Sequence, residues 1–223
     1  MIFSKSMNAL KVPRMVVLVM LIAAVIGGVL YLNSQELSRT AVSGEALEVR
    51  TVLGIGEKDR LYQVAKEITT PDGFINTGQN LDGSAKPISI GEFVGSKVVL
   101  VDFWTYSCIN CQRTTPYLNA WYQKYKDEGL VIIGLHTPEF EFEKIYQNVL
   151  EATKSMEIKY PVVLDNDYST WNAYRNRFWP RKYLIDINGY IVYDHIGEGK
   201  YEETEKKIQE ALAERKVVLG NSG

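Results

Sequence analysis

The sequence predicts an α/β fold in which helices cover both faces of a mixed central sheet, preceded by one N-terminal transmembrane helix. Residues 97–104 and 130–135 are apolar almost throughout, which is typical of strands buried on both faces. Helical periodicity follows each run, and Asn188-Gly189 separates two later apolar runs, which predicts a hairpin with a type I′ turn. Strands joined by helices and followed by a hairpin give a mixed sheet. At the start of the chain, residues 15–32 carry no charged side chain.

The uncharged N-terminal run predicts a membrane anchor. At about 1.5 Å per residue, residues 15–32 span nearly the ~30 Å hydrocarbon core of a bilayer. Lys5, Lys11 and Arg14 precede the run, so the positive-inside rule places residues 1–14 in the cytoplasm and the rest of the chain outside. We therefore expect a single-pass cell-membrane protein with a cytoplasmic N-terminus and an extracytoplasmic folded domain.

A cleaved signal peptide is the alternative to this anchor. The residues directly after the run, Asn33-Ser34-Gln35-Glu36, form a poor cleavage signal because small residues are needed there. Ala41-Val42-Ser43 lies further on and keeps cleavage open as an alternative. No cysteine lies near the run, which excludes a lipoprotein anchor. We expect an uncleaved signal-anchor.

The remainder of the 223 residues has room for one domain of ordinary size and a short appendage. Residues 33–70 are polar and mixed in composition, and we expect a linker that carries a short helix near residues 58–67. The folded domain is predicted over residues 71–216, and residues 217–223 form a C-terminal tail.

Strands and helices alternate along the folded domain. Strands are predicted at residues 97–104, 130–135, 161–164, 182–187 and 190–193, and helices at 109–128, 141–155, 168–176 and 203–215. The second helix is predicted because five apolar residues recur at helical spacing: Phe142, Ile145, Tyr146, Val149 and Leu150.

Charge and cysteine content exclude several classes of protein. Lys and Arg number 25 against 27 Asp and Glu, a balance that does not favour nucleic acid as a partner. The two cysteines are too few for a secreted fold stapled by disulfides, and a four-ligand zinc site would need both histidines, His136 and His195, as well. We expect no metal and no cofactor, and a merely structural His195. The two cysteines are then either a redox pair or an accident of spacing.

The positions of Cys108 and Cys111 predict redox chemistry. Cys108 follows a buried strand and opens a helix, where free backbone N–H groups and the helix dipole stabilise a thiolate. Cys111 lies one turn later on the same face and is less exposed. Cys108 would therefore attack a substrate disulfide, and Cys111 would resolve the mixed disulfide that forms. A buried, inert thiol pair is the alternative.

The segment Val101-Asp-Phe-Trp-Thr-Tyr-Ser-Cys-Ile-Asn-Cys111 resembles the active-site strand and helix of thioredoxin-like proteins. Pro116 lies where that superfamily has its kinking proline, and Trp179-Pro180 lies where it has a cis-proline. The chain is more similar to TlpA-type redoxins, and most similar to the thioredoxin-like domain of DipZ-type membrane proteins, over about residues 72–214. Further stretches that carry the resemblance are His136-Thr-Pro-Glu-Phe140, Tyr160-Pro161, Asp165-Asn-Asp167 and Trp179-Pro-Arg-Lys-Tyr-Leu-Ile-Asp186.

The resemblance implies roles for the residues around the cysteines. Asp102 lies within a buried strand, where a carboxylate tends to have a raised pKa, and the family places it beneath the second cysteine as the group that takes the Cys111 proton. Pro180 would set a backbone edge against an extended substrate segment. Trp179 and Tyr106 would contact the partner, although core packing explains both equally well.

Three further residues could change how readily the cysteine thiols ionise. Ser107 stands where the family often has a tryptophan directly before the first cysteine. Glu139 and His136 follow the second buried strand at the same edge of the sheet, and a structural role explains His136 at least as well. The pair between the cysteines, Ile109-Asn110, differs from the Gly-Pro of thioredoxins, so neither redox potential nor direction carries over.

We expect a membrane-anchored, extracytoplasmic thiol–disulfide oxidoreductase that reduces protein disulfides. An oxidising compartment already holds oxidants, so a dedicated reductase needs an electron donor, and the resemblance implies a CcdA-type membrane carrier. The disulfides that it reduces would belong to cytochrome c maturation or to the general repair of wrongly paired cysteines. A thiol peroxidase, from the Thr105-Tyr-Ser-Cys108 pattern, and a copper-binding metallochaperone that uses both cysteines and His136 are the alternatives.

Overall fold

The computed structural model describes residues 55–220. The predicted cytoplasmic segment 1–14, the predicted transmembrane segment 15–32 and the first part of the predicted linker lie outside these residues. Within residues 55–220, no helix combines the length and the apolar character needed to span a bilayer. All elements described below belong to one compact unit.

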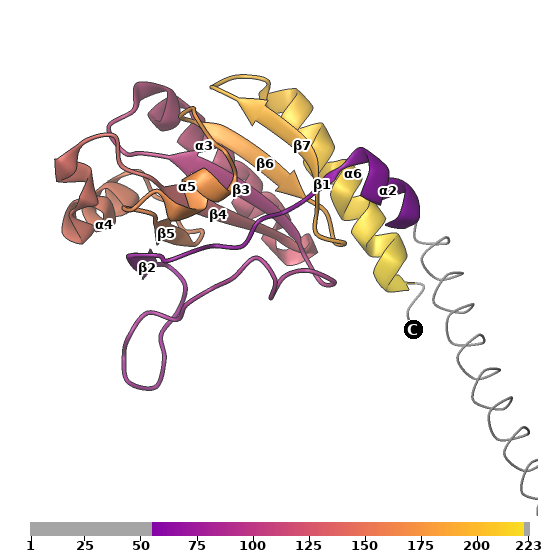
Figure 1. Ribbon diagram of the computed structural model, residues 1–223, viewed down its shortest axis with the longest axis horizontal. Helices are drawn as coiled ribbons and strands as arrows, with labels where there is room; N and C mark the ends of the chain where they lie inside the picture. Colours follow the sequence, from indigo (N-terminus) through magenta and orange to yellow (C-terminus); the bar gives the residue numbers. More distant parts are fainter. Residues whose placement is uncertain (1–54, 221–223) are drawn as a thin grey trace, which may run out of the picture. The chain divides into compact units, whose positions relative to one another are not determined.

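A mixed seven-stranded sheet forms the centre of this unit (Figure 1). Its order is β1-β7-β6-β3-β4-β5-β2, and β3 pairs in parallel with β4 and antiparallel with β6. The bounds are β1 Gln63–Val64, β2 Gly73–Ile75, β3 Val98–Trp104, β4 Leu130–His136, β5 Val162–Leu164, β6 Arg181–Ile185 and β7 Tyr190–Ile196. The predicted mixed sheet and its five predicted strands are confirmed.

Side chains of β3 alternate between the two faces of the sheet, and every one of them is buried. Leu100 and Trp104 join the core beneath α3 (Ile109–Tyr125), which also includes residues from α4 (Tyr146–Ser155) and α6 (Tyr201–Gly220). Val99, Val101 and Phe103 join the opposite core, which α5 (Ser169–Ala173) and the segment before β3 cover. Burial on both faces explains the near-continuous apolar run of β3.

The predicted hairpin between β6 and β7 is present, but its turn is not the expected type I′. Only Gly189 has a left-handed conformation (φ 88°), and its N–H donates to the Asp186 carbonyl at 3.0 Å. A three-residue loop of this kind, a type I turn closed by a left-handed glycine, is the next most common hairpin connection. The Asp186 carboxylate accepts from the N–H groups of Asn188 and Tyr190 and stabilises this loop.

Residues 55–70, which the sequence assigned to a linker, are part of the folded unit. They form α2 (Ile55–Leu61) and the edge strand β1, and Lys58 of α2 pairs with Asp186 and Glu214. The Glu67 carboxylate accepts from the N–H groups of Ile90 and Gly91. Polar residues dominate here because the segment lies at a sheet edge and at the surface. Ion pairs and hydrogen bonds, rather than buried apolar side chains, hold it to the rest of the domain. At the other end, α6 extends to Gly220, into the predicted tail 217–223.

The predicted helix 141–155 is interrupted, and part of its predicted apolar stripe is exposed. Residues Glu141–Lys144 form a 3-10 turn, η2, and Ile145 is extended before α4 begins at Tyr146. The break rotates the first residues of the stripe away from the core, so that Phe142, Ile145 and Tyr146 are each 42–52% exposed. Glu143 is buried in their place. The prediction of one continuous helix over residues 141–155 was therefore wrong over its first five residues.

Candidate active site

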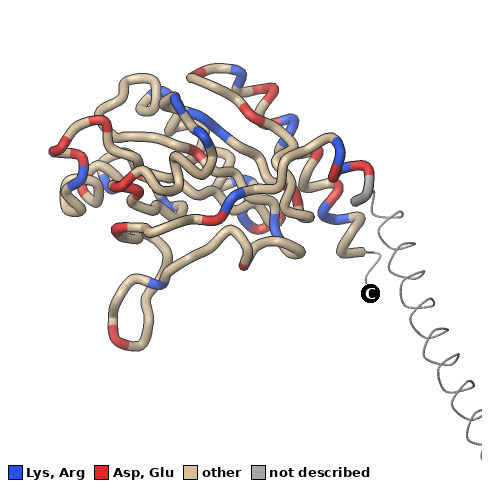
Figure 2. Tube along the Cα trace, viewed as in Figure 1, with Lys and Arg blue, Asp and Glu red and all other residues tan. Residues whose placement is uncertain are grey.

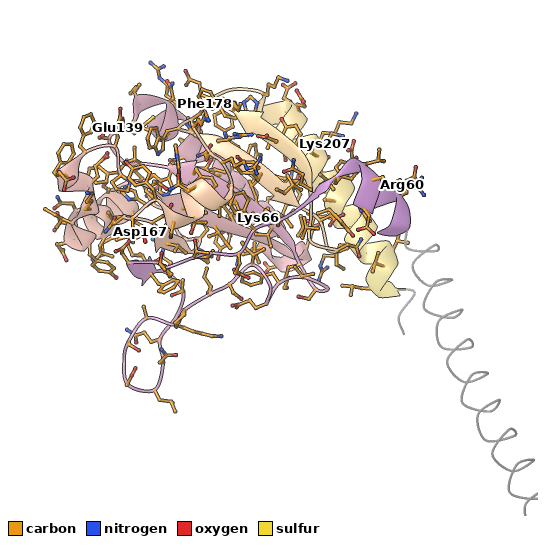
Figure 3. The ribbon with its side chains drawn as sticks, in the orientation of Figure 1. Arg60, Lys66, Glu139, Asp167, Phe178 and Lys207 are labelled. Atoms are coloured by element: carbon orange, nitrogen blue, oxygen red, sulfur yellow. The ribbon has the colours of Figure 1, made fainter. Side chains whose placement is uncertain are left out.

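The two cysteines lie at the edge of the sheet where β3 and β4 end and β6 begins. Cys108 is the N-cap residue of α3, with extended backbone angles (φ −71°, ψ 116°), and it is partly exposed. Cys111 is one turn into the helix and buried. Both are free thiols in this structure. Figure 3 shows Glu139, which follows β4, and Phe178, which precedes β6, at this end of the domain.

The two thiols have opposite electrostatic environments. A hydrogen bond from the Cys111 thiol lowers the pKa of Cys108, and the backbone N–H groups of Cys111 and Asn110 add to this against the opposing effect of burial, so that the value falls to about 6. Burial raises the pKa of the Cys111 thiol, as do its bond to Cys108 and the Asp102 carboxylate. At neutral pH, Cys108 is therefore largely a thiolate nucleophile, whereas Cys111 keeps its proton.

Asp102 lies in the middle of β3, on the face that α3 covers, and is 2% exposed. Burial raises the pKa of this carboxyl to about 7, the Lys182 ammonium opposes the increase, and the Cys108 thiolate adds to it. Lys182 Nζ lies 4.0 Å from Asp102 Oδ1, and Oδ1 has no hydrogen-bond partner. A carboxyl that titrates near neutral pH in this position can exchange a proton with a neighbouring thiol.

His136 ends β4 and is fully buried beneath the loop that carries the cysteine. The Tyr106 ring stacks on the imidazole with centroids 5.6 Å apart, and Trp104 contacts it edge-on at 5.2 Å. Burial lowers the pKa of His136 to about 4. The imidazole is therefore neutral at physiological pH, and it supports the Tyr106–Ser107 loop from below.

Glu143 is a site residue that the sequence analysis missed. It is fully buried and accepts hydrogen bonds from the Ser107 hydroxyl at 2.6 Å and from the N–H groups of Glu139 at 2.6 Å and Phe140 at 2.9 Å. Burial alone would raise the pKa of Glu143, but these bonds and one from the Thr105 hydroxyl hold it below its usual range. A glutamate at the third position of a helical turn often accepts from the N-cap N–H, and this spacing after Phe140 was the available signal.

The loop before β6 closes the other side of the site. The peptide bond between Trp179 and Pro180 is cis, as the resemblance implies, and the Pro180 carbonyl accepts from Gly197 at 2.8 Å. Trp179 donates through Nε1 to the Thr137 carbonyl at 3.0 Å and packs on Trp171 with centroids 4.2 Å apart. Trp179 is therefore a fixed, half-buried wall of the site.

The predicted site residues converge on this one edge of the sheet, with unequal exposure. Asp102 and His136 are buried, Tyr106 and Trp179 are half-buried, and Glu139 is exposed. The most exposed aromatic side chains near the cysteines are instead three that were not predicted as site residues: Phe140, Phe142 and Phe178. Phe140 and Phe142 stack on each other at 5.5 Å.

Neither alternative function gains a specific contact in this arrangement. The Thr105 hydroxyl, which the peroxidase pattern would place against the cysteine, is buried and lies 3.4 Å from His136 Nε2. Over residues 55–220, no three His, Cys, Asp or Glu side chains are grouped so that they could hold a metal ion.

Comparison with known proteins identifies the family of the chain. Residues 65–212 match the family model described as Redoxin. The chain is 48% identical over 153 residues to Protein DipZ of Mycobacterium tuberculosis, which is 66% of this chain and 21% of DipZ. It is 33% identical over 128 residues to the thiol-disulfide oxidoreductase ResA of Bacillus cereus, which is 57% of this chain and 70% of ResA.

A solved structure supports the same assignment. The solution structure of a thioredoxin-like protein in the oxidised form superposes with a TM-score of 0.58 at 25% identity, over 69% of this chain and 97% of that one. The chain spans about a fifth of the length of the DipZ proteins it matches. It belongs to the Redoxin family and is a thioredoxin-like redoxin related to DipZ and to ResA.

Proposed function

We propose that this chain is a thiol–disulfide oxidoreductase whose reactive centre is the Cys108–Cys111 pair. The observation that carries the proposal is the asymmetry of the two thiols. Cys108 is partly exposed at a helix N-terminus with a pKa of about 6, and Cys111 is buried, protonated and bonded to it. Relatives that are named thiol-disulfide oxidoreductases support the same chemistry.

The exchange proceeds in two steps. The Cys108 thiolate attacks one sulfur of a protein disulfide, the substrate S–S bond breaks, and the leaving thiolate takes a proton. Cys111 then attacks Cys108, which releases the second substrate thiol and leaves a Cys108–Cys111 disulfide. Two electrons pass from the chain to the substrate, and both cysteines must be reduced again before the next turnover.

The neighbouring residues have distinct roles in this proposal. Asp102 takes the proton of Cys111 in the second step, since its carboxyl titrates near pH 7 beneath the pair. The backbone at Pro180 and the half-buried rings of Trp179 and Tyr106 contact the substrate segment. Ser107 and His136 fix the approach to Cys108, and the negative charge of Glu139 opposes thiolate formation there.

We further propose that the N-terminal run 15–32 is an uncleaved anchor that holds the domain on the outer side of the cytoplasmic membrane. The uncharged run and the basic residues before it support this orientation. The described domain has Lys and Arg interspersed with Asp and Glu along its course (Figure 2), which fits protein substrates and does not favour nucleic acid. In this compartment the chain would act as a reductant that receives electrons from a CcdA-type membrane donor. Cytochrome c maturation is one process in which its substrates would take part.

Reduction of insulin disulfides by the full chain in detergent tests the central claim. We expect Cys108→Ser to abolish the activity and Cys111→Ser to trap a mixed disulfide on Cys108. If Cys108→Ser reduced insulin as the wild type does, the claim would be wrong. The reduction potential of the Cys108–Cys111 pair gives the direction of electron transfer. A value of about −270 mV indicates a reductant, and a value of about −120 mV indicates an oxidant.

Anchoring and orientation have a separate test. A membrane-impermeant maleimide added to intact cells should label Cys108 of the membrane-bound full chain before lysis. Label that appears only after lysis would overturn the outward orientation, and a full chain that does not sediment with membranes would overturn the anchor.

A further inference from the structure

A groove of about 740 Å³ lies over β6 and β7, on the face of the sheet opposite to Cys111, and the proposed exchange reaction gives it no role. Ligand-binding sites typically have volumes of about 300–1,000 Å³. Residues 61–66, the end of α5, β6 and β7 line this β6–β7 groove. Tyr174 and Tyr183 are nearly buried and form its floor, whereas Leu61 and Val64 are exposed at its rim. The groove is therefore open to a partner.

The β6–β7 groove carries two cations without acidic partners. Lys66 lies on the segment that continues from β1 (Figure 3), and Arg175 follows α5, with both side chains exposed. Within residues 55–220, neither side chain forms an ion pair or a hydrogen bond. The third cation, Arg181, pairs with Asp194, which is the one acidic residue among those that line the groove. Three cations against one carboxylate leave an excess of positive charge in the groove, although the whole chain has a formal net charge of −2.

Arg175 occupies a backbone position that does not favour arginine. It has a left-handed conformation (φ 50°), its N–H donates to the Asn172 carbonyl at 3.0 Å, and the Asn176 N–H donates to the Trp171 carbonyl at 2.9 Å. These two bonds form the Schellman motif that ends a helix, in which the left-handed residue is usually glycine and sometimes asparagine. A residue with a Cβ is strained in this conformation. The end of α5 therefore does not require arginine, and the charge at this position needs another explanation.

Arg181 and Tyr183 form a fixed, flat surface inside the groove. The Arg181 guanidinium lies 4.7 Å from the centroid of the Tyr183 ring, and its Nε donates to the Asp194 carboxylate at 2.9 Å. The exposed apolar side chains of Leu61 and Val64 lie beside this surface at the rim. Apolar surface next to unpaired cations is complementary to a chain segment in which apolar residues alternate with carboxylates.

The groove begins at the loop that closes the active site. Arg181 directly follows Pro180, whose backbone contacts the substrate segment in the proposed reaction. A protein held at Cys108 can therefore reach the groove with the chain that continues past Pro180. Glu139, which is exposed, opposes thiolate formation at Cys108 by its negative charge. Negative charge beside the cysteine and positive charge in the groove favour one orientation of an acidic partner.

We propose that the β6–β7 groove is a docking site for an extended acidic segment of the protein whose disulfide Cys108 attacks. The carboxylates of the segment pair with Lys66 and Arg175, and its apolar residues cover Leu61 and Val64. The inference rests on the proposed function and deepens it, because it names the class of substrate as disulfide proteins with an acidic segment near their cysteines. Charge complementarity at a rim acts mainly on association, so the groove favours capture of the substrate and leaves the chemistry at Cys108 unchanged.

Two synthetic disulfide peptides test this preference with the full chain in detergent. Both contain the same disulfide loop and a flexible linker, and they end in a tail that alternates leucine with either glutamate or glutamine. Two exposed ion pairs should raise kcat/KM for the glutamate peptide at least about threefold over the glutamine peptide at about 0.01 M NaCl. The difference should lie in KM, and it should vanish at about 1 M NaCl, where the charges are screened. The linker is lengthened stepwise, and equal kcat/KM values at every length would overturn the inference.

A matched pair of double variants separates the groove from net charge. Lys66→Gln with Arg175→Asn removes both free cations, and asparagine adopts the left-handed conformation more readily than arginine, so the urea midpoint should not fall. This variant should reduce both peptides with the kcat/KM that the wild type shows for the glutamine peptide. Lys86→Gln with Lys154→Gln removes the same charge from exposed lysines elsewhere and should keep the preference. Equal loss of the preference in both double variants would show that overall charge selects the peptide, and the groove would then have no part in it.

Direct binding separates this inference from the proposed function. The glutamate peptide with serine in place of its cysteines cannot exchange disulfides, but it should shift the backbone amide signals of Lys66 and Arg175 in Cys108→Ser. If the peptide bound while the wild type reduced no disulfide, the proposed function would be wrong and the groove would remain a peptide-binding site. Disulfide reduction without these shifts would overturn the docking site.

An anionic lipid headgroup is the competing occupant of the groove. Full chain in nanodiscs of phosphatidylglycerol and of phosphatidylcholine distinguishes it from the acidic segment, and we expect the same amide signals of Lys66 and Arg175 in both lipids. Signals that shift only in phosphatidylglycerol, together with equal kcat/KM values for the two peptides, would assign the groove to lipid and contradict the inference.

Discussion

The Ser107 hydroxyl donates a 2.6 Å hydrogen bond to the buried Glu143 carboxylate, which ties the residue before Cys108 to the turn after β4. The same carboxylate accepts from the N–H groups of Glu139 and Phe140. One side chain therefore organises two loops that meet at Cys108. A serine before the cysteine allows this link, because the larger aromatic residue often found there in the family has no side-chain hydroxyl in the same position.

We expect Glu143→Gln to lower both stability and activity. The amide keeps one acceptor oxygen but turns an NH2 group toward backbone N–H donors, so at least one buried polar group loses its partner, at a cost of about 1–3 kcal/mol. Urea denaturation and the rate of insulin reduction would measure the two effects. Glu141→Gln is the matched control, because Glu141 is 88% exposed and should change stability by less than about 0.5 kcal/mol. Equal effects of the two substitutions would contradict the role of Glu143.

The reactivity of Cys108 should follow its thiolate. Because the pKa of Cys108 is lowered to about 6, the rate of alkylation by iodoacetamide should rise with a midpoint near pH 6, well below that of a free cysteine. Cys111→Ala removes the S–H donor, which is the largest cause of the shift, and should move this midpoint to higher pH. Cys111→Ser keeps a hydroxyl donor and should give a smaller shift. A midpoint that is the same in all three proteins would show that the thiol pair is not coupled.

Much of the site was predictable from sequence because it depends on local order along the chain. Cys108 follows a buried strand, begins a helix and lies one turn before Cys111, so the Cys111 thiol and the helix N–H groups that lower its pKa follow from its place along the chain. The strand that carries Asp102 was recognisable from its unbroken apolar run. These features need neither long-range contacts nor exact angles.

The features that sequence did not predict depend on partners far along the chain. Glu143 is buried because Ser107, 36 positions earlier, offers it a hydroxyl, and Lys182 is recognisable as a partner of Asp102 only once the β3–β6 register is known. The periodicity of residues 141–155 indicated one helix, but the bonds to Glu143 favour a separate 3-10 turn and leave Phe142 at the surface. The edge strands β1 and β2 are two and three residues long, which is too short to give a periodic signal.

Buried His136 should make the protein less stable in mild acid. The folded-state pKa of about 4 lies below the ordinary histidine pKa of 6.5, so below pH 6.5 the unfolded chain binds a proton that the folded chain does not. The contribution of this histidine is therefore fully present above about pH 6.5 and is lost as the pH falls toward 4, by up to about 3 kcal/mol. His136→Phe, which keeps an aromatic ring in the stack with Tyr106, should remove this dependence.

The effect of His136 is the difference between the free energies of unfolding of the wild type and of His136→Phe, measured as a function of pH. Asp102 and Asp165 have raised pKa values and titrate in the opposite sense, and both are present in the wild type and in the variant. Urea midpoints at intervals between pH 4 and pH 7 give this difference. A difference that does not change with pH would mean that His136 has the same pKa in the folded domain as in the unfolded chain.

Lys58→Met should destabilise the domain without altering thiol exchange. Lys58 pairs with Asp186, whose side chain is fully buried, and with Glu214 on α6. Its removal leaves a buried carboxylate held only by the turn N–H groups, at a cost of about 1–3 kcal/mol. Asp186 follows the end of β6 opposite to Pro180, so the rate of insulin reduction should stay at the wild-type value. Lys86→Met, at an exposed loop lysine, is the matched control and should leave the urea midpoint unchanged. A loss of stability of the same size in both variants would show that the Lys58 pair does not hold α2 against the sheet.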